Sequence, residues 1–178
     1  MPNRFAEIIV RCEDLQQRTF IYRCLVEKGL RPHTIQIKHN PRGDAKRFVL
    51  DQYPIEVKAL RRTPHISKAV ISMIDADDCT VEDTKRQHDD ALKANGEPRR
   101  ADAEKIAILV PRRNIETWIH HLLGETVNEN DKYPRFRHEE RRCAPAAEDF
   151  ARRCPNDMRA ADLPSLRAGC EELRRVMV

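Results

Sequence analysis

Four short apolar runs rich in β-branched residues alternate with amphipathic segments along residues 6–124. Such runs are typical of strands buried on both faces, as in a parallel sheet whose connections are helices. They predict strands over 6–12, 33–39, 67–78 and 104–111. The intervening segments carry apolar residues at helical spacing and predict helices over 13–29, 43–62, 80–96 and 114–124. Pro54 lies inside the second of these helices and predicts a kink or a break there. We therefore expect an α/β fold with a central four-stranded, mostly parallel sheet flanked by helices.

The C-terminal part of the chain has a different pattern. Residues 128–142 are polar and predict an exposed loop, and two further helices are expected near 145–154 and 164–177. A chain of 178 residues is long enough for one domain with a real core and too short for two comfortable ones. We expect an α/β domain over 1–130 and a helical C-terminal extension over 131–178 that packs on the same domain.

Charge is distributed unevenly along the sequence. Residues 31–68 contain nine basic and three acidic residues, whereas residues 69–130 contain eight basic and thirteen acidic ones. Basic surface beside clustered carboxylates is what a metal-dependent enzyme acting on polyphosphate or nucleic acid needs. Unevenly charged, solvated helix faces are the alternative interpretation. On the first interpretation, the basic segment would bind nucleic acid through Arg42, Lys46, Arg47, Lys58, Arg61 and Arg62.

The N-terminus and the cysteines bear on where the protein works. The segment MPNRFAEIIVRCEDLQQ reaches acidic and amide residues too early for a signal peptide. No apolar run approaches the roughly 20 residues needed to span a bilayer. The six cysteines include no C-x-x-C pair, the usual signature of a structural zinc site. We expect a cytoplasmic protein with no membrane partner, whose cysteines are reduced.

Four carboxylates follow the predicted strands. Glu13 comes after the first strand, Asp75 and Asp77 end the third, and Glu116 lies in the first turn of the helix after the fourth. In open parallel sheets, ligands bind beyond the carboxyl ends of the strands, so these side chains are expected at one edge. Like charges gathered there require a cation, and hard oxygen ligands select Mg²⁺ or Mn²⁺. The alternative is that each acid stabilises the helix that follows it through the helix dipole.

At these residues the sequence resembles the TOPRIM family, which includes the catalytic domain of topoisomerases, bacterial primases and nucleases of the overcoming-lysogenization-defect type. The segments CEDLQQRTFIYRCL and ISMIDADDCTVEDTKRQ stand where that family has a Glu after its first strand and an Asp-x-Asp after a later one. The segment ILVPRRNIETWIHHLLG is similar to a Pro-x-x-x-Ile-Glu-x-Trp stretch in small stand-alone TOPRIM proteins of bacterial defence and mobile-element loci. The resemblance covers roughly residues 6–124. It departs from the family at Asp14, where Gly is usual, and at Gln17, where an acid is frequent.

The resemblance implies a metal-dependent nuclease that cuts DNA or RNA. Asp75 and Asp77 would anchor the Mg²⁺ or Mn²⁺ that meets the phosphate, and Glu13 would complete this site or act as general base. Glu116 would hold a second metal. The neighbouring Arg112 and Arg113 would contact phosphate oxygens.

Two other functions remain open at this point. A non-catalytic TOPRIM-like subunit that binds nucleic acid or a partner protein is favoured by the altered first motif. A response-regulator-like receiver would need a Lys at the end of its last strand, where this chain has LVPRR. The resemblance also raises an effector role in a bacterial defence system, with an ATPase or another subunit as partner. A homo-oligomer is left open.

Overall fold

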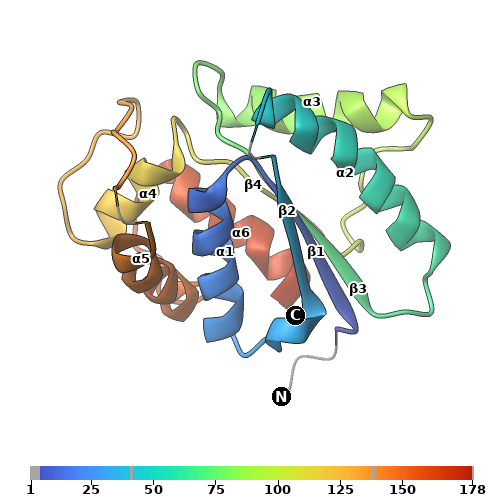
Figure 1. The fold of residues 1–178 in the computed structure, drawn as a ribbon, viewed down its shortest axis with the longest axis horizontal. Coiled ribbons are helices and arrows are strands. Elements are labelled where there is room, and N and C mark those ends of the chain that lie inside the picture. Colours follow the sequence, from blue (N-terminus) through green and yellow to red (C-terminus); the bar gives the residue numbers. More distant parts are fainter. Residues whose placement is uncertain (1–4, 41, 138, 178) are drawn as a thin grey trace.

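The computed structural model describes residues 5–40, 42–137 and 139–177 (Figure 1). Its strands are β1 (Glu7–Cys12), β2 (Ile35–His39), β3 (Lys68–Met73) and β4 (Ile106–Leu109). Its α-helices are α1 (Leu15–Glu27), α2 (Ala45–Arg62), α3 (Val81–Ala94), α4 (Ile115–Leu122), α5 (Glu139–Arg153) and α6 (Pro164–Met177). A single 3₁₀ turn, Pro32–Thr34, precedes β2.

The four strands form one sheet in the order β2-β1-β3-β4, and every neighbouring pair is parallel. Val10 of β1 pairs with Ile37 on one side and with Ile71 on the other, and Ile71 pairs in turn with Ala107. The α/β fold with a parallel sheet flanked by helices is confirmed. The expectation of a mostly parallel sheet is refined, because these strands are all parallel.

Helices cover both faces of the sheet (Figure 1). One face packs against α1, α4, α5 and α6, where Phe20, Trp118 and Phe150 meet with ring centroids 5.8–6.1 Å apart. The other face packs against α2 and α3 through a smaller cluster that includes Tyr53 and Leu92. Among the described residues, no helix is long and apolar enough to cross a membrane.

Three local expectations differ from the structure. Pro54 does not interrupt α2, since Val49, Tyr53 and Val57 on either side of it are buried and keep the helix against the sheet. The helix expected near 145–154 begins earlier, at Glu139, so part of the expected loop is helical. The cysteines are not all reduced, because Cys154 at the end of α5 is disulfide-bonded to Cys170 of α6.

Candidate acidic site at the carboxyl edge of the sheet

The sheet order brings the four carboxylates to one edge. Strands β1, β3 and β4 are neighbours and parallel, so their carboxyl ends lie side by side. Glu13 follows β1, Asp75 and Asp77 follow β3, and Glu116 lies in the first turn of α4, just after β4. The segment after β3 continues along the neighbouring chain: Ile74 N–H donates to Leu109 O and Ala76 N–H to Pro111 O.

Glu13 and Asp75 are joined by a network that runs through Gln17. Asp75 N–H donates to Glu13 Oε1 (2.5 Å). The Gln17 amide accepts from Glu13 N–H and donates to Asp75 Oδ1, both at 2.9 Å. Asp14 caps α1 by accepting from Gln17 N–H (2.9 Å), which fixes the first turn that carries Gln17. The loop after β1 and the loop after β3 are therefore held in one arrangement.

Asp77 lies between two lysines. Its carboxylate is 3.7 Å from Lys46 Nζ and 3.8 Å from Lys132 Nζ. Lys46 comes from the first turn of α2 and also donates to Asp75 O (3.1 Å). Asp77 has a positive φ of 54°, a conformation that costs a non-glycine residue energy and is enriched at functional sites. Arg113 holds this conformation, since its guanidinium donates to Asp77 O (2.9 Å) and to Asp78 Oδ1 (2.6 Å).

Glu116 is buried, with 2% of its surface exposed. Among the described residues, its Oε1 has no hydrogen-bond partner. Asn114, at the N-cap of α4, does not accept from a backbone N–H of the helix. Its side-chain amide donates to Tyr133 O (2.7 Å), and its Oδ1 accepts from Thr117 Oγ1 (3.0 Å). A buried carboxylate oxygen without a donor is costly unless it is protonated or meets a cation.

Burial and mutual repulsion disfavour the charged form of these acids. Burial raises the pKa of Glu13 to about 7, and the nearby Asp77 charge adds to the shift. Burial also raises the pKa of Glu116 to about 7, with Asp14 contributing. The pKa of Asp75 is raised well above its usual range by burial and by Glu13 and Glu116. The edge is thus an electrostatically unfavourable place for so many anions unless positive charge is added.

The segment 125–137 supplies some of that charge. Lys132 faces Asp77, and Arg135 lies 3.1 Å from Asp14. Tyr133 anchors the segment by pairing with Asn114 and by stacking on His120, with ring centroids 5.0 Å apart. The residues that sequence reasoning missed are Gln17, Lys132 and Arg135. Gln17 carried one signal: it shares the apolar face of α1 with Phe20, Ile21 and Cys24, where a polar residue is unusual.

The expected phosphate-binding residues lie in three places. Lys46, Arg112 and Arg113 lie at the acidic edge, where Arg112 donates to Cys79 O (2.6 Å). Arg42 and Arg47 lie near the start of α2 and are exposed, and Arg47 pairs with Asp51.

Three of the expected residues lie far from the acids. The 18 residues of α2 span about 27 Å, which carries Lys58, Arg61 and Arg62 away from the edge. Arg61 is held by Glu97 and Glu104, and Lys58 lies 3.7 Å from Glu97. The structure therefore places Lys46, Arg112 and Arg113 at the same edge as the acids and leaves Lys58, Arg61 and Arg62 at the opposite end of α2.

The donor set fits a hard divalent cation by its chemistry. Carboxylate oxygens are the ligands that Mg²⁺ and Mn²⁺ prefer, and Glu116 Oε1 has no donor of its own. Across residues 5–40, 42–137 and 139–177, however, no three Asp, Glu, His or Cys side chains converge to hold a metal ion as they stand. The Asp77 side chain is 42% exposed and is paired with Lys46 and Lys132.

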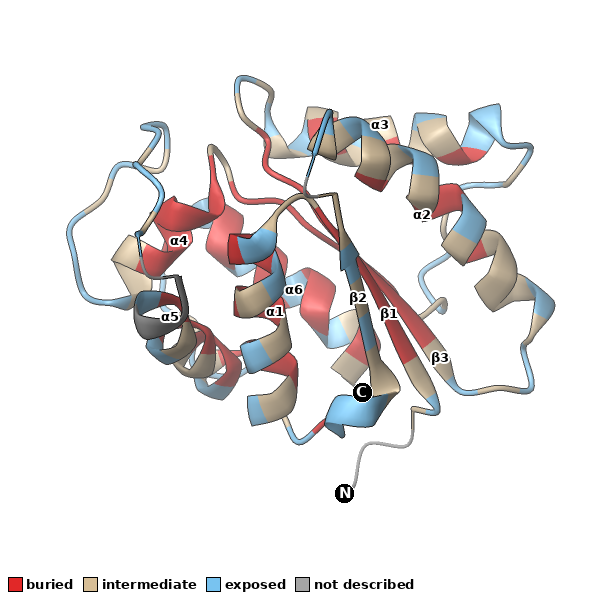
Figure 2. Cartoon of the chain, in the orientation of Figure 1, coloured by how far each residue is buried: buried red, intermediate tan, exposed pale blue. Residues whose placement is uncertain are grey.

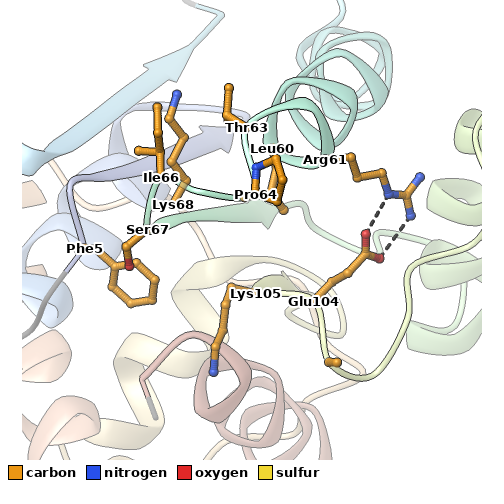
Figure 3. Close-up of a pocket in the computed structure, with 11 residues that line it drawn as sticks. Phe5, Leu60, Arg61, Thr63, Pro64, Ile66, Ser67, Lys68, Glu104 and Lys105 are labelled. Atoms are coloured by element: carbon orange, nitrogen blue, oxygen red, sulfur yellow. Dashed lines mark hydrogen bonds and ion pairs between the residues drawn. The ribbon is translucent and has the colours of Figure 1, made fainter.

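A pocket of about 540 Å³ lies at the other end of the sheet (Figure 3). Its apolar wall includes Phe5, Leu60 and Ile66. The amino groups of Lys68 and Lys105 point in opposite directions there, so they do not converge on one ligand (Figure 3). This pocket is separate from the acidic edge, because Lys68 begins β3 and Lys105 precedes β4.

Comparison of the chain with known proteins finds no relative. No protein-family model matches the chain, and no curated protein or solved structure is significantly similar to it. The function of the protein is therefore inferred from the acidic edge of the sheet.

Proposed function

We propose that this protein is a divalent-metal-dependent TOPRIM-type nuclease that hydrolyses phosphodiester bonds in DNA or RNA. The observation that carries the proposal is the gathering of Glu13, Asp75, Asp77 and Glu116 at the carboxyl ends of adjacent parallel strands. Burial and repulsion there disfavour the anions, and a bound cation would offset both effects.

The residues have distinct roles in this proposal. Asp75 and Asp77, with Glu13, would hold Mg²⁺ or Mn²⁺, and Glu116 would hold a second ion. When bound, such an ion supplies positive charge to the phosphate oxygens. As the alternative to binding the ion, Glu13 would act as general base for an attacking water: without metal, burial raises its pKa to about 7, so it can take up a proton near neutral pH.

Cations around the edge would bind the substrate backbone. Lys46, Arg112 and Arg113 lie at the edge, and Lys132 and Arg135 approach it from the segment 125–137. Phosphate contacts by such side chains release counterions, so affinity would fall as salt rises, with a log–log slope of about −0.9 per contact on duplex DNA. An effector role in a defence system, with an ATPase partner, remains part of the proposal on the strength of the resemblance.

Metal titration tests the proposal without relying on activity. Calorimetry with Mn²⁺ should give heat of binding for the wild type and little for Asp75→Asn. Asp90→Asn is the matched control, because Asp90 is an exposed acid on α3. Equal heats from the wild type and Asp75→Asn would contradict the metal site.

Cleavage is tested next on labelled DNA and RNA with Mn²⁺. Asp77→Ala should abolish cleavage without collapsing the melting temperature measured without metal, because the repulsion of Glu13 and Asp75 that is relieved offsets the lost pairs with Lys46 and Lys132. A collapsed melting temperature would mark Asp77 as structural instead.

A second function is favoured by one observation. Lys46 and Lys132 already flank Asp77, so the protein's own cations partly neutralise the site. On this alternative the chain is a non-catalytic TOPRIM-like subunit that binds nucleic acid or a partner. Metal-independent binding of nucleic acid, with no cleavage alone or with the product of a neighbouring gene, would favour it.

A further inference from the structure

The outer edges of the two outermost strands, β2 and β4, differ in whether their backbone groups are hydrogen-bonded. Side chains from other elements satisfy the outer edge of β4: Ile108 N–H donates to Glu172 Oε2 (3.0 Å), and Ile106 O accepts from Arg100 and Arg175, both at 3.0 Å. Helix α6, which carries Glu172 and Arg175, lies along this strand. The β4 edge is therefore closed to another strand.

The outer edge of β2 is open. Its one strand neighbour is β1. Within the described part of the chain, the only side-chain hydrogen bond to the β2 backbone comes from that neighbour, from the Cys12 thiol to Lys38 O (3.8 Å). Figure 2 shows β1 and β3 mostly buried, whereas β2 is half-buried and exposed. An edge of this kind has unpaired N–H and C=O groups that can pair with an added strand.

A groove runs beside this edge on the α1 side. It has a volume of about 230 Å³, and its walls include Leu15 and Tyr22 of α1 and Ile35 and Ile37 of β2. Leu15 is 43% exposed, and Ile35 and Ile37 pack on the core from one side only. Apolar side chains on alternate positions of an added strand would cover these residues.

The rim of the groove is basic. Arg18 and Arg23 of α1 line it, whereas Lys38 alternates with Ile37 and projects from the opposite face of β2. Among the described residues, these three form no ion pair, although most other cations near the sheet do. An occupant with acidic side chains would meet this unpaired charge.

We propose that β2 is the docking edge for an extended, acidic segment of a partner protein, which adds to the sheet as a fifth strand. Its groove-facing side chains would be apolar against Leu15, Tyr22 and Ile37 and acidic beside Arg18 and Arg23. An acidic side chain on its other face would pair with Lys38. A second copy of this chain fits less well, because two β2 edges side by side would bring these same cations together.

The inference is tested with the full chain and two synthetic heptapeptides. One has Val and Glu in turn at its groove-facing positions and Glu at the positions between them, and the other has Lys in place of every Glu. Fluorescence anisotropy should detect binding of the acidic peptide and much weaker binding of the basic one. Hydrogen exchange should slow at residues 35–39 when the acidic peptide is bound.

Charge-reversal variants locate the site. The double variant Arg18→Glu/Arg23→Glu should bind the acidic peptide about tenfold more weakly or worse, since two attractive contacts become repulsive. Arg159→Glu/Arg167→Glu reverses two exposed cations elsewhere and should leave binding unchanged.

Four results would overturn the proposal. The first is that the acidic peptide fails to bind at millimolar concentration. The second is that both peptides bind with equal affinity, and the third is that the acidic peptide binds without slowing hydrogen exchange at residues 35–39. The fourth is a concentration-dependent dimer in which 35–39 become protected, which would assign the edge to a second copy.

Discussion

Gln17 donates a hydrogen bond from its side-chain amide to Asp75 Oδ1 at 2.9 Å, across 58 positions of the sequence. The same amide accepts from the backbone N–H of Glu13, so one neutral side chain fixes both the Asp75 carboxylate and the stretch of backbone that carries Glu13. A donor to Asp75 favours its anionic form and partly opposes the effect of burial. The amide therefore orients the acids without adding a further negative charge.

Replacing Gln17 by Leu should destabilise the protein by about 1–3 kcal/mol, because a buried donor and a buried acceptor lose their partner. Gln16→Leu is the matched control. Gln16 is also buried in α1, but neither atom of its amide has a hydrogen-bond partner among the described residues. Its replacement should be neutral or stabilising. Denaturant unfolding measures both, and equal losses would show that the Gln17 network contributes nothing specific.

Metal-free stability should fall as pH rises from about 4.5 to about 7. The carboxyls of Glu13 and Glu116 have an ordinary pKa of 4.5, and in the folded protein the pKa of each is about 7. The folded state therefore binds these protons more tightly than the unfolded state does. The stability that this difference contributes is lost as pH rises through the pKa of the folded protein. Melting temperatures across this range measure the effect, and Glu13→Gln/Glu116→Gln should reduce it.

Mn²⁺ affinity should change in the opposite direction, rising as pH increases from about 5.5 to 8. Protons compete with the cation while the carboxyls remain protonated, by up to about tenfold per pH unit for each carboxyl. Calorimetric titration at several pH values measures this rise. An affinity independent of pH would mean that the metal binds elsewhere.

Asp77→Gly and Asp77→Ala separate backbone strain from charge at the same position. Both remove the carboxylate and should abolish metal binding. Glycine adopts a φ of 54° freely, whereas alanine does not. The Asp77→Gly protein should therefore be more stable than the Asp77→Ala protein by about 1 kcal/mol. Thermal unfolding without metal provides the comparison, and equal stabilities would argue against strain at this residue.

Gly169→Ala tests the close contact between α6 and α4. A Cβ at Gly169 would lie 2.5 Å from an atom of the Trp118 ring, whose Nε1–H donates to Ser165 Oγ. The overlap should cost about 1–3 kcal/mol, partly offset by the gain of about 1 kcal/mol in helix propensity. Trp118 is the single tryptophan, so its fluorescence reports the rearrangement. Ala168→Gly, one residue earlier, measures the reverse change in helix propensity together with the loss of one half-buried methyl group.

The sheet could be predicted because its signal is local. The runs containing Val10, Ile71 and Ile108 are apolar on successive residues, as buried parallel strands require. The start of α5 could not be predicted: among the residues of α5 whose burial is described, the buried ones are at Cys143, Ala146, Ala147, Phe150 and Ala151, in its later turns. Its first turn is polar and has the composition of a loop.

The acidic edge could be anticipated in part. The positions of Asp75 and Asp77 after a buried strand were sufficient to place them at its carboxyl end. The cations were harder to place, because Arg61 is close to Lys46 in sequence but lies four turns further along α2. Lys132 reaches Asp77 only through the path of segment 125–137, which depends on the pairing of Tyr133 with Asn114.

The closed edge at β4 limits how far this sheet can be extended. A chain with two available edges can polymerise, since each added molecule presents a new edge to the next. In this protein Glu172, Arg100 and Arg175 occupy the hydrogen-bonding groups at the β4 edge. A strand added at β2 therefore leaves no open edge on the other side of the sheet. Association through the sheet therefore stops at a complex of fixed size, and fibre growth by strand addition is terminated at its first step.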